Sequence, residues 1–309
     1  MPKLYIDEFV GISNRLETLP LAFAIRKEYG HDIILDWRDL DSFSVDDTRR
    51  GKVRIVARLG AERIRECDSS RFASLGGKKI ILRSLDGPSD KLDPIYLEVA
   101  KKVHLKPGLA AEIRETFAAR NGRPVIGVHI RRGDFHVIDH SRYDSQSLEY
   151  PGVPIWWYEK TMAAITGREK NACFFLCCTG DPASYESLHR NFDVFSLEIR
   201  SHYGYKEQTS HESTVNPVAD LFALACCPVL LATPVSGYSH WAANALGEPT
   251  TCIVPLPGAT PEVPAMGKLQ MYGKRLPLWR AAGRIGTAER LSDGLDGIEL
   301  HQKMITNWL

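Results

Sequence analysis

The sequence lacks several features that would assign it to a special class of protein. Its 39 Lys and Arg residues face 38 Asp and Glu residues, so the formal net charge is +1. Without a general positive field, binding to nucleic acid would need a local basic patch. No stretch approaches the roughly 18 apolar residues of a membrane-spanning helix, and the start, MPKLYIDEFV, does not resemble a secretory signal. We therefore expect a cytoplasmic protein without a membrane span and without a nucleic-acid partner.

Cysteine occurs seven times, but not in the spacing of a metal site or a disulfide framework. The number is odd, no C-x-x-C pair occurs, and five of the seven lie in the apolar runs 172-ACFFLCC-178 and 223-ALACCPVLLA-232. In a reducing compartment such residues are small buried apolar side chains. We expect no metal site and no cofactor.

The sequence does contain a regular alternation of short apolar runs and amphipathic stretches. Eight runs have the length of strands: residues 3–5, 33–37, 79–84, 125–130, 173–178, 193–197, 228–232 and 251–256. Stretches with a period of 3.6 residues lie between many of them, at 14–30, 109–122, 157–169 and 217–227. This alternation predicts an α/β fold of βαβ units, with parallel sheets covered on both faces.

The length of 309 residues predicts two domains. Between residues 105 and 130 a helical stretch is followed by a Gly-Arg-Pro break and a new apolar strand, which indicates a domain boundary. We predict a Rossmann-like domain over residues 1–115 and a second over 116–275. A helical tail, 276–309, is expected to pack back across both.

Two loops that follow predicted strands suit an anionic ligand. In the first, Gly11 allows close approach of the backbone, and Ser13 or Asn14 can cap a helix whose N–H groups attract phosphate, although an ordinary βα loop explains the same residues. In the second, the strand 125–130 runs directly into two arginines.

This second loop, in 127-GVHIRRGDF-135, places cations at the carboxyl end of a strand, where α/β sheets bind ligands. Because side chains alternate along a strand, His129 and Arg131 point to one side and Arg132 to the other. The guanidinium fork of Arg131 matches phosphate oxygens, and Asp134 can pair with either arginine. A surface ion pair is the alternative.

Three motifs resemble those of the GDP-fucose-dependent fucosyltransferases, the superfamily of α1,2-, α1,6- and protein O-fucosyl enzymes. The segment 129-HIRRGDF-135 resembles their His-x-Arg-Arg motif, and 11-GISNRLETLPLAFAIRKEYGHDIILDWR-38 is similar to their Gly-x-x-Asn loop, helix and second strand. The segment 219-ADLFALACCPVLLATPVSGYSHWAANALG-247 resembles the last motif. Residues 33–38 are closer to the nodulation α1,6 enzymes and 236–243 to bacterial α1,2 enzymes, so the linkage stays open.

The resemblance implies the GT-B glycosyltransferase fold and inversion at the sugar carbon without a metal. The N-terminal domain would lie on the acceptor side, and the C-terminal domain would bind most of the donor. It implies a set of donor-binding residues, in which Arg131 clamps the diphosphate, His129 and Asp220 contact guanine, and two loops face the phosphates: Gly11, Ser13 and Asn14, and Ser236 and Gly237. A carboxylate suits the N–H and amino donors of guanine, although Asp220 could merely complement a helix dipole.

An inverting transfer also needs a base to deprotonate the acceptor hydroxyl. The resemblance to the α1,6 enzymes implies Asp139, while Asp134, His136 and Asp144 remain alternatives. The predicted reaction transfers L-fucose from GDP-β-L-fucose to a hydroxyl of a bacterial oligosaccharide, chitooligosaccharide or lipid-linked glycan. A superfamily enzyme with another GDP-sugar, or a non-catalytic GDP-sugar-binding protein, is the alternative.

Overall fold

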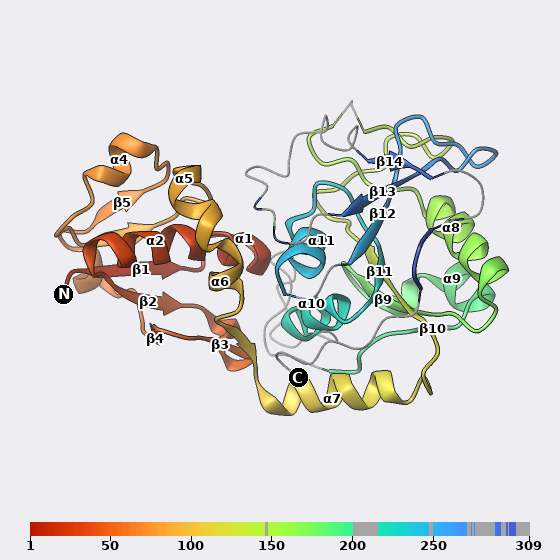
Figure 1. The fold of residues 1–309 in the computed structure, drawn as a ribbon, viewed down its shortest axis with the longest axis horizontal. Helices are drawn as coiled ribbons and strands as arrows, with labels where there is room; N and C mark the ends of the chain where they lie inside the picture. Colours follow the sequence, from red (N-terminus) through yellow and green to blue (C-terminus); the bar gives the residue numbers. More distant parts are fainter. Residues whose placement is uncertain are drawn as a thin grey trace. The chain divides into compact units, whose positions relative to one another are not determined.

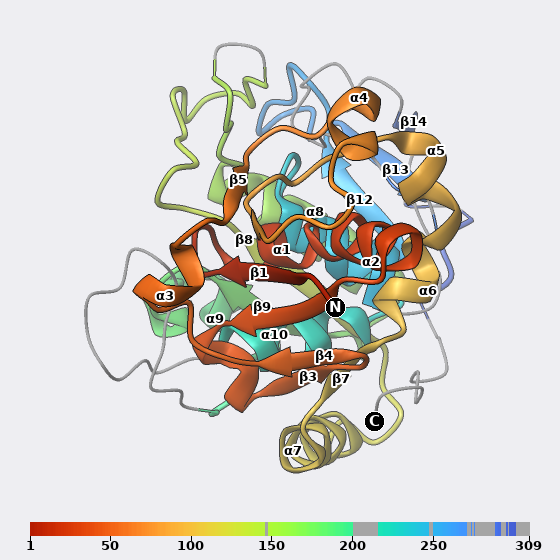
Figure 2. The same cartoon turned by 90° about the vertical axis from the view of Figure 1, so that its left-hand side faces the viewer.

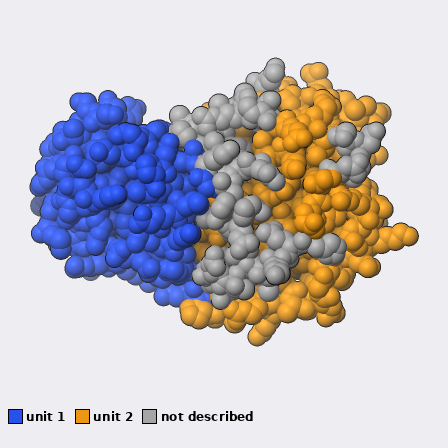
Figure 3. Space-filling view, viewed as in Figure 1, with its two compact units in different colours: residues 1–106, 273–277 blue, residues 107–272, 278–309 orange. Residues whose placement is uncertain are grey.

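The protein consists of two compact units in a computed structural model that describes residues 1–145, 148–199, 216–246, 250–270, 288–291 and 297–300, and single residues 273, 275 and 295. Unit 1 comprises residues 1–106 and 273–277, and unit 2 comprises 107–272 and 278–309 (Figure 3). The sequence-based boundary at residue 115 falls inside helix α7 (Pro107–Ala118), whereas the two units divide just before this helix. Phe117 of this helix packs on Phe175, with ring centroids 5.7 Å apart. Most of the tail from residue 276 lies outside the described residues, so its packing stays a prediction.

Unit 1 is built on a five-stranded parallel sheet in the order β4-β2-β1-β6-β5 (Figure 2). Its strands are β1 (Lys3–Asp7), β2 (Asp32–Asp36), β4 (Thr48–Arg50), β5 (Glu62–Ile64) and β6 (Ile80–Leu82), and β3 (Phe43–Val45) pairs with β7 (Val103–Leu105) in a separate ribbon. Its helices are α1 (Ile12–Leu16), α2 (Leu19–Tyr29), α3 (Ile55–Arg58), α4 (Ser69–Ala73), α5 (Ser89–Leu92) and α6 (Tyr96–Ala100). The strand order reverses beside β1, so the loop after β1 lies at a topological switch point.

One predicted helix of unit 1, over residues 14–30, is divided into α1 and α2. Pro20 lacks an N–H group, so it cannot donate to the carbonyl of Leu16, and the hydroxyl of Thr18 donates to the carbonyl of Arg15 at 2.6 Å. The prediction that Ser13 or Asn14 caps this helix is wrong. Both lie inside α1, which begins after Gly11 without a side-chain cap.

Unit 2 is built on a seven-stranded sheet in the order β10-β9-β8-β11-β12-β13-β14 (Figure 1). Its strands are β8 (Val125–Ile130), β9 (Cys173–Cys178), β10 (Val194–Phe195), β11 (Val229–Leu231), β12 (Thr251–Pro255), β13 (Met266–Gln270) and β14 (Glu289–Arg290). The first five are parallel, and β13 and β14 add antiparallel strands. Besides α7, the helices are α8 (Ile155–Arg168), α9 (Glu186–Asn191), α10 (Pro217–Ala225) and α11 (Gly237–Trp241), which continues as a π-helical turn (Ala242–Leu246).

Helices cover both faces of this sheet, so the central strands are buried on both sides (Figure 1). Ile126, Val128 and Ile130 of β8 belong to one core with Trp157 of α8. The alternate residues face α10, and Gly127 allows that helix to lie close: a Cβ there would be 3.1 Å from Leu224. No helix within the described residues is both long and apolar enough to cross a bilayer.

Candidate functional site

The predicted residues of unit 2 gather where the strand order of its sheet reverses. From β8 the chain continues to β9 and β10 on one side, and then returns to β11 and β12 on the other. The carboxyl ends of β8 and β11 therefore flank a switch point, the usual ligand position in an open α/β sheet. Thr233, after β11, joins the two ends: its Oγ1 donates to the carbonyl of His129 at 2.8 Å and accepts from the N–H of Arg131 at 3.0 Å.

Arg131 is held at this switch point by neighbouring side chains and stays partly exposed. Its side chain is 18% exposed, and Nη2 donates to Oδ1 of Asp134 at 2.8 Å. Nη1 lies 3.4 Å from Oγ1 of Thr179, and the group sits over the ring of Phe135. The predicted pairing of Asp134 with an arginine is confirmed. Arg132 turns the other way and donates to the carbonyl of Val153 at 2.9 Å, as strand alternation predicts.

His129 is buried beside Arg131 and is neutral. It is 2% exposed, its Nδ1 lies 2.7 Å from Oγ of Ser239, and its ring stacks on that of Tyr238 at 5.0 Å between centroids. Burial, together with the positive charge of Arg131, lowers the pKa of His129 to about 3. A neutral imidazole offers one donor and one acceptor, so His129 can hydrogen-bond a ligand without adding charge.

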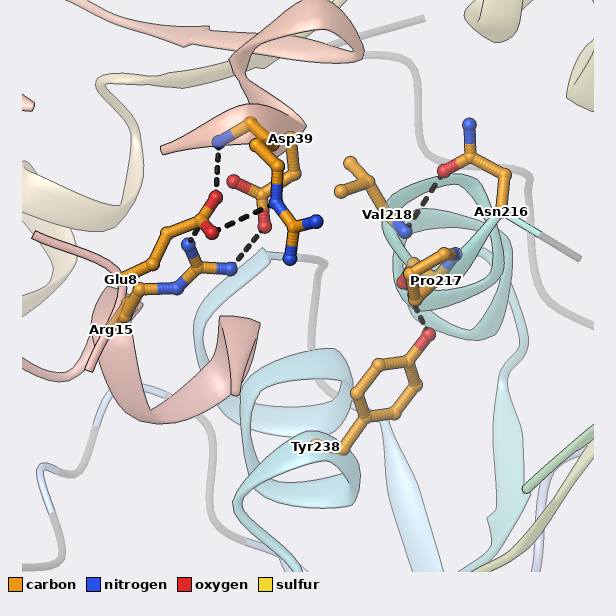
Figure 4. A network of polar contacts seen from close by, with 8 residues as sticks. Glu8, Arg15, Asp39, Asn216, Pro217, Val218 and Tyr238 are labelled. Carbon is orange, nitrogen blue, oxygen red and sulfur yellow. Dashed lines mark hydrogen bonds and ion pairs between the residues drawn. The ribbon is translucent and has the colours of Figure 1, made fainter. Parts of the chain in front are cut away.

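Asp220 lies in the first turn of α10, where Asn216 already caps the helix. Oδ1 of Asn216 accepts from the N–H group of Val218 at 3.0 Å (Figure 4) and from that of Ala219 at 3.1 Å. Asp220 is 4% exposed, and burial raises its pKa to about 8. Among the described residues no hydrogen bond or ion pair engages its carboxyl group. A ligand that brings its own hydrogen-bond donors would stabilise the ionised form of such a buried carboxyl group.

Tyr238 connects His129 with the helix that carries Asp220. Besides stacking on His129, its hydroxyl donates to the carbonyl of Pro217, the first residue of α10, at 2.5 Å (Figure 4). One side chain thereby sets both the ring plane of His129 and the start of α10. The structure thus brings His129, Arg131 and the N-terminal turn of α10 into one neighbourhood.

Ser236 and Gly237 form the loop that leads into α11. Val235 has φ +67°, a left-handed conformation that costs a β-branched residue about 1–3 kcal/mol. Strain of this kind concentrates at functional sites. Ser236 is buried and occupies the N-cap position without a side-chain capping bond. The assignment of this loop to a phosphate stays a prediction.

The remaining loop residues, Gly11, Ser13 and Asn14, belong to unit 1, so the predicted donor-binding residues fall in two groups, one in each unit. Gly11 has an ordinary φ of −62°, and a Cβ there would meet nothing within 4 Å. Neither conformation nor internal packing requires glycine at this position, and the space in front of its backbone is open to a ligand.

A buried arginine anchors the helix that follows Gly11. Arg15 is 6% exposed, donates to Asp39 and lies 3.4 Å from Glu8 (Figure 4). Its guanidinium group lies over the ring of Trp37. Glu8 also accepts from Nε of Arg38 at 2.9 Å. This network fixes α1 to the turn after β2.

The segment Asp39-Leu40-Asp41 has the Asp-x-Asp spacing of a metal site, but arginines occupy both carboxylates. Asp39 binds Arg15, and Oδ1 of Asp41 accepts from Arg50 at 2.5 Å. In the part of the chain that the structure describes, no group of three His, Cys, Asp or Glu residues could hold a metal ion. All seven cysteines are buried and free, as small apolar side chains should be.

The candidate base, Asp139, is tied into its own loop. Its Oδ1 accepts from the N–H and the hydroxyl of Ser141 at 2.8 and 2.6 Å, and Oδ2 lies 3.2 Å from Nε of Arg142. These hydrogen bonds lower the pKa of Asp139. The indole N–H of Trp156 holds the loop through the carbonyl of His140 at 2.8 Å. Among the alternatives, Asp134 is engaged by Arg131, and the role of Asp139 stays a prediction.

Sequence reasoning missed the residues that hold this site in place. They are Tyr158, whose hydroxyl donates to the carbonyl of His129 at 2.9 Å, and Thr233, Tyr238 and Ser239. Thr233, Tyr238 and Ser239 lie inside the third motif, which was the one available signal. No sequence signal pointed to Tyr158, because its partner, the carbonyl of His129, is 29 positions away in the chain.

The protein resembles known proteins in structure but not in sequence. No family model and no curated protein matches the sequence. Among solved structures, the NodZ α-1,6-fucosyltransferase crystallised with GDP has a TM-score of 0.54 at 15% identity and covers 88% of this chain and 99% of its own. POFUT1 in complex with GDP has a TM-score of 0.51 at 10% identity, over 80% of this chain and 96% of its own. A variant of Arabidopsis thaliana FUT1 in complex with GDP has a TM-score of 0.51 at 12% identity, and the match covers 88% of this chain and 74% of its own.

These matches define the fold as the GT-B fold of glycosyltransferases, with two Rossmann-like units, and confirm the predicted fold class. Within that fold, the matching structures named above are fucosyltransferases bound to GDP.

Proposed function

We propose that the protein is an inverting glycosyltransferase that transfers L-fucose from GDP-β-L-fucose to a hydroxyl group of a glycan. One observation carries the proposal: Arg131, oriented by Asp134 and Thr179, lies at the switch point of unit 2 with its side chain 18% exposed. The solved structures with this fold include the NodZ enzyme soaked with GDP-fucose, with a TM-score of 0.53 at 14% identity.

The diphosphate of the donor is assigned to Arg131 and to the loop of Ser236 and Gly237 in unit 2, while Gly11, Ser13 and Asn14 form the separate candidate phosphate loop of unit 1. Arg131 can offer two parallel N–H donors to phosphate oxygens. As the bond between the sugar carbon and the phosphate oxygen breaks, negative charge grows on the departing GDP. A fixed cation stabilises that charge without reorganisation, which lowers the barrier.

Guanine recognition is assigned to His129 and Asp220. When Asp220 ionises, its two oxygens accept from the ring N–H and the amino group of guanine, and these donors compensate the burial that raises its pKa to about 8. His129, held neutral, adds a hydrogen bond from the strand side. The pair distinguishes guanine from adenine, whose edge presents a different pattern of donors and acceptors.

The acceptor hydroxyl needs a base, and Asp139 is assigned this role. Its carboxylate takes the proton as the acceptor oxygen bonds to the anomeric carbon and the carbon–phosphate oxygen bond breaks, so GDP leaves on the opposite face with inversion. The low pKa of Asp139 keeps it ionised, although it also makes it a weak base. An oligosaccharide, chitooligosaccharide or lipid-linked glycan is the proposed acceptor.

The test is release of GDP from a panel of donors, with and without acceptors. GDP-fucose should release GDP fastest in the presence of a glycan acceptor, with GDP-mannose as the matched donor control. Faster release from GDP-mannose would reassign the donor. No release from any donor, despite GDP binding, would reduce the protein to a GDP-sugar-binding protein.

A further inference from the structure

Helix α3 of unit 1 exposes a group of large aliphatic side chains. Ile55, Val56 and Leu59 are 79%, 76% and 67% exposed. They lie within five consecutive positions, on α3 and at its C-cap. Isolated apolar residues on a surface are ordinary, whereas a contiguous group marks a site of interaction.

The orientation of α3 is fixed by the residues on its inner side. Val53 belongs to a small core with Tyr5 and Ile81 of the sheet, and the small side chains of Ala57 and Ala61 pack against that core. The segment therefore turns its small residues toward the sheet and its large aliphatic residues outward, the reverse of the usual amphipathic pattern.

A lysine from outside the helix also holds it in this orientation. Nζ of Lys79 donates to the carbonyls of Val56 and Leu59 at 2.9 and 3.0 Å. The outward apolar side is thus a built feature of unit 1, and α3 itself lies near the periphery of the cartoon in Figure 2.

The same segment concentrates positive charge. Residues 49–65 contain seven basic residues and one acidic residue, a formal charge of +6 in a chain whose total is +1, and three of the basic residues, Arg49, Arg50 and Lys52, pair with Asp32, Asp41 and Asp36 outside the segment. Arg54 and Arg58, which flank the aliphatic side chains, are exposed and take part in no ion pair among the described residues. The one acidic residue, Glu62, is already paired with Arg71 and Lys78.

We propose that this α3 surface, formed by Ile55, Val56 and Leu59 with Arg54 and Arg58, docks the protein on an anionic phospholipid bilayer. Aliphatic side chains can enter the boundary between headgroups and acyl chains, while neighbouring guanidinium groups bind lipid phosphates. The docking is peripheral and needs no membrane-spanning segment.

The charge and composition of the segment favour a bilayer over other partners. A second copy of the chain, meeting this surface by a two-fold axis, would place like charges against each other. Single-stranded nucleic acid binds through stacking on aromatic rings, and residues 48–65 contain none. If the proposed function holds, docking would bring the enzyme to a surface that carries lipid-linked acceptors, and that consequence alone rests on the proposed function.

The test is co-sedimentation of the full chain with vesicles, measured without donor or acceptor. We expect binding to vesicles of phosphatidylcholine and phosphatidylglycerol, release by high salt, and little binding to phosphatidylcholine alone. The triple variant Ile55→Ser/Val56→Ser/Leu59→Ser and the double variant Arg54→Gln/Arg58→Gln should each weaken binding by about tenfold or more. The matched controls lie in unit 2. Val263→Ser removes an aliphatic side chain that is 63% exposed, and Arg114→Gln/Arg190→Gln removes two exposed arginines.

Equal binding by the triple variant, or equal binding to both kinds of vesicle, would overturn the proposal. A dimer in solution that the triple variant dissociates, without vesicle binding, would assign the surface to a second copy instead. Because no sugar donor is present, failure of vesicle binding leaves the proposed transfer reaction standing, and failure of transfer leaves the docking result standing.

Discussion

At the scale of single residues, burial is the main cause of the chemical states of two titratable groups in the candidate site. His129 and Asp220 are both almost fully buried; burial, together with the charge of Arg131, lowers the pKa of His129 to about 3, and burial raises that of Asp220 to about 8. The imidazole is neutral throughout the physiological range, whereas the carboxyl group changes its charge within it. The identity of Asp220 could be selected from the sequence, but its pKa could not, because it depends on packing around α10.

Asp220→Asn should remove the preference for guanine. The NH₂ group of the amide would face a donor of guanine where the carboxylate had presented an acceptor. The buried donors then stay unpaired, at a cost of about 1–3 kcal/mol of binding free energy. We expect the affinity for GDP to fall at least about tenfold and the ratio of GDP to IDP affinities, measured by calorimetry, to approach one. IDP lacks the amino group, so the ratio reports on the contact between that group and Asp220. A general folding defect would weaken the binding of both nucleotides alike and leave the ratio unchanged. An unchanged ratio would assign Asp220 to the helix dipole.

The raised pKa of Asp220 predicts a pH dependence of donor binding. The free protein holds this group protonated below about pH 8, and binding requires the carboxylate. Affinity should therefore rise with pH, by up to about tenfold per unit below the pKa, and protons should be released on binding. GDP-fucose is the appropriate ligand, because it has no terminal phosphate to titrate. The variant Asp220→Asn should bind independently of pH between 6 and 8, and a wild-type profile equally flat would contradict the account.

At the scale of secondary-structure elements, the strands buried on both faces were predictable and the polar ones were not. The six-residue apolar runs of β8 and β9 matched the observed strands in full. The three-residue strands β3, β4, β5 and β7, and the polar strand β13, form through pairing with neighbours and leave no apolar run in the sequence. The contact between His129 and Ser239 spans 110 positions, which local patterns do not encode.

Tyr238→Phe should test whether α10 is positioned through its first turn. The variant loses the hydrogen bond to Pro217 and keeps the ring that stacks on His129. We expect KM for GDP-fucose to rise several-fold and the GDP-to-IDP preference to shrink, with kcat little changed. The matched control is Tyr29→Phe in unit 1, which loses a similar bond to the carbonyl of Phe72 at 3.1 Å. Equal kinetic effects of the two variants would remove Tyr238 from donor binding.

At the scale of the whole molecule, both Rossmann-like units place a candidate phosphate loop at a switch point between parallel strands. The sequence predicted this architecture because apolar strands and amphipathic helices alternate along it. The residue at which the first unit ends was harder to predict, since the sequence pattern of α7 is the same whether this helix ends the first unit or begins the second.

The proposed role of Arg131 predicts donor binding without a divalent metal. In that proposal Arg131 and backbone N–H groups supply the positive charge, and the Asp-x-Asp segment at Asp39 is occupied by Arg15 and Arg50. Calorimetry with GDP in EDTA and in excess Mg²⁺ should give affinities within about threefold of each other, in the micromolar range. Binding that disappears in EDTA would show that a metal carries the diphosphate.

The most direct measurement of the central claim is the rate of fucose transfer by Arg131→Ala, Arg131→Lys and Arg123→Ala. Arg123 precedes β8 and pairs with Asp193 at 2.5 Å, so its substitution removes the same group from the opposite end of the strand. The account predicts that Arg131→Ala lowers kcat by about 10²–10³, that Arg131→Lys recovers little of it because a point charge cannot replace the bidentate fork, and that Arg123→Ala stays near wild type. A folded Arg131→Ala protein that keeps more than about a tenth of wild-type turnover would contradict the account.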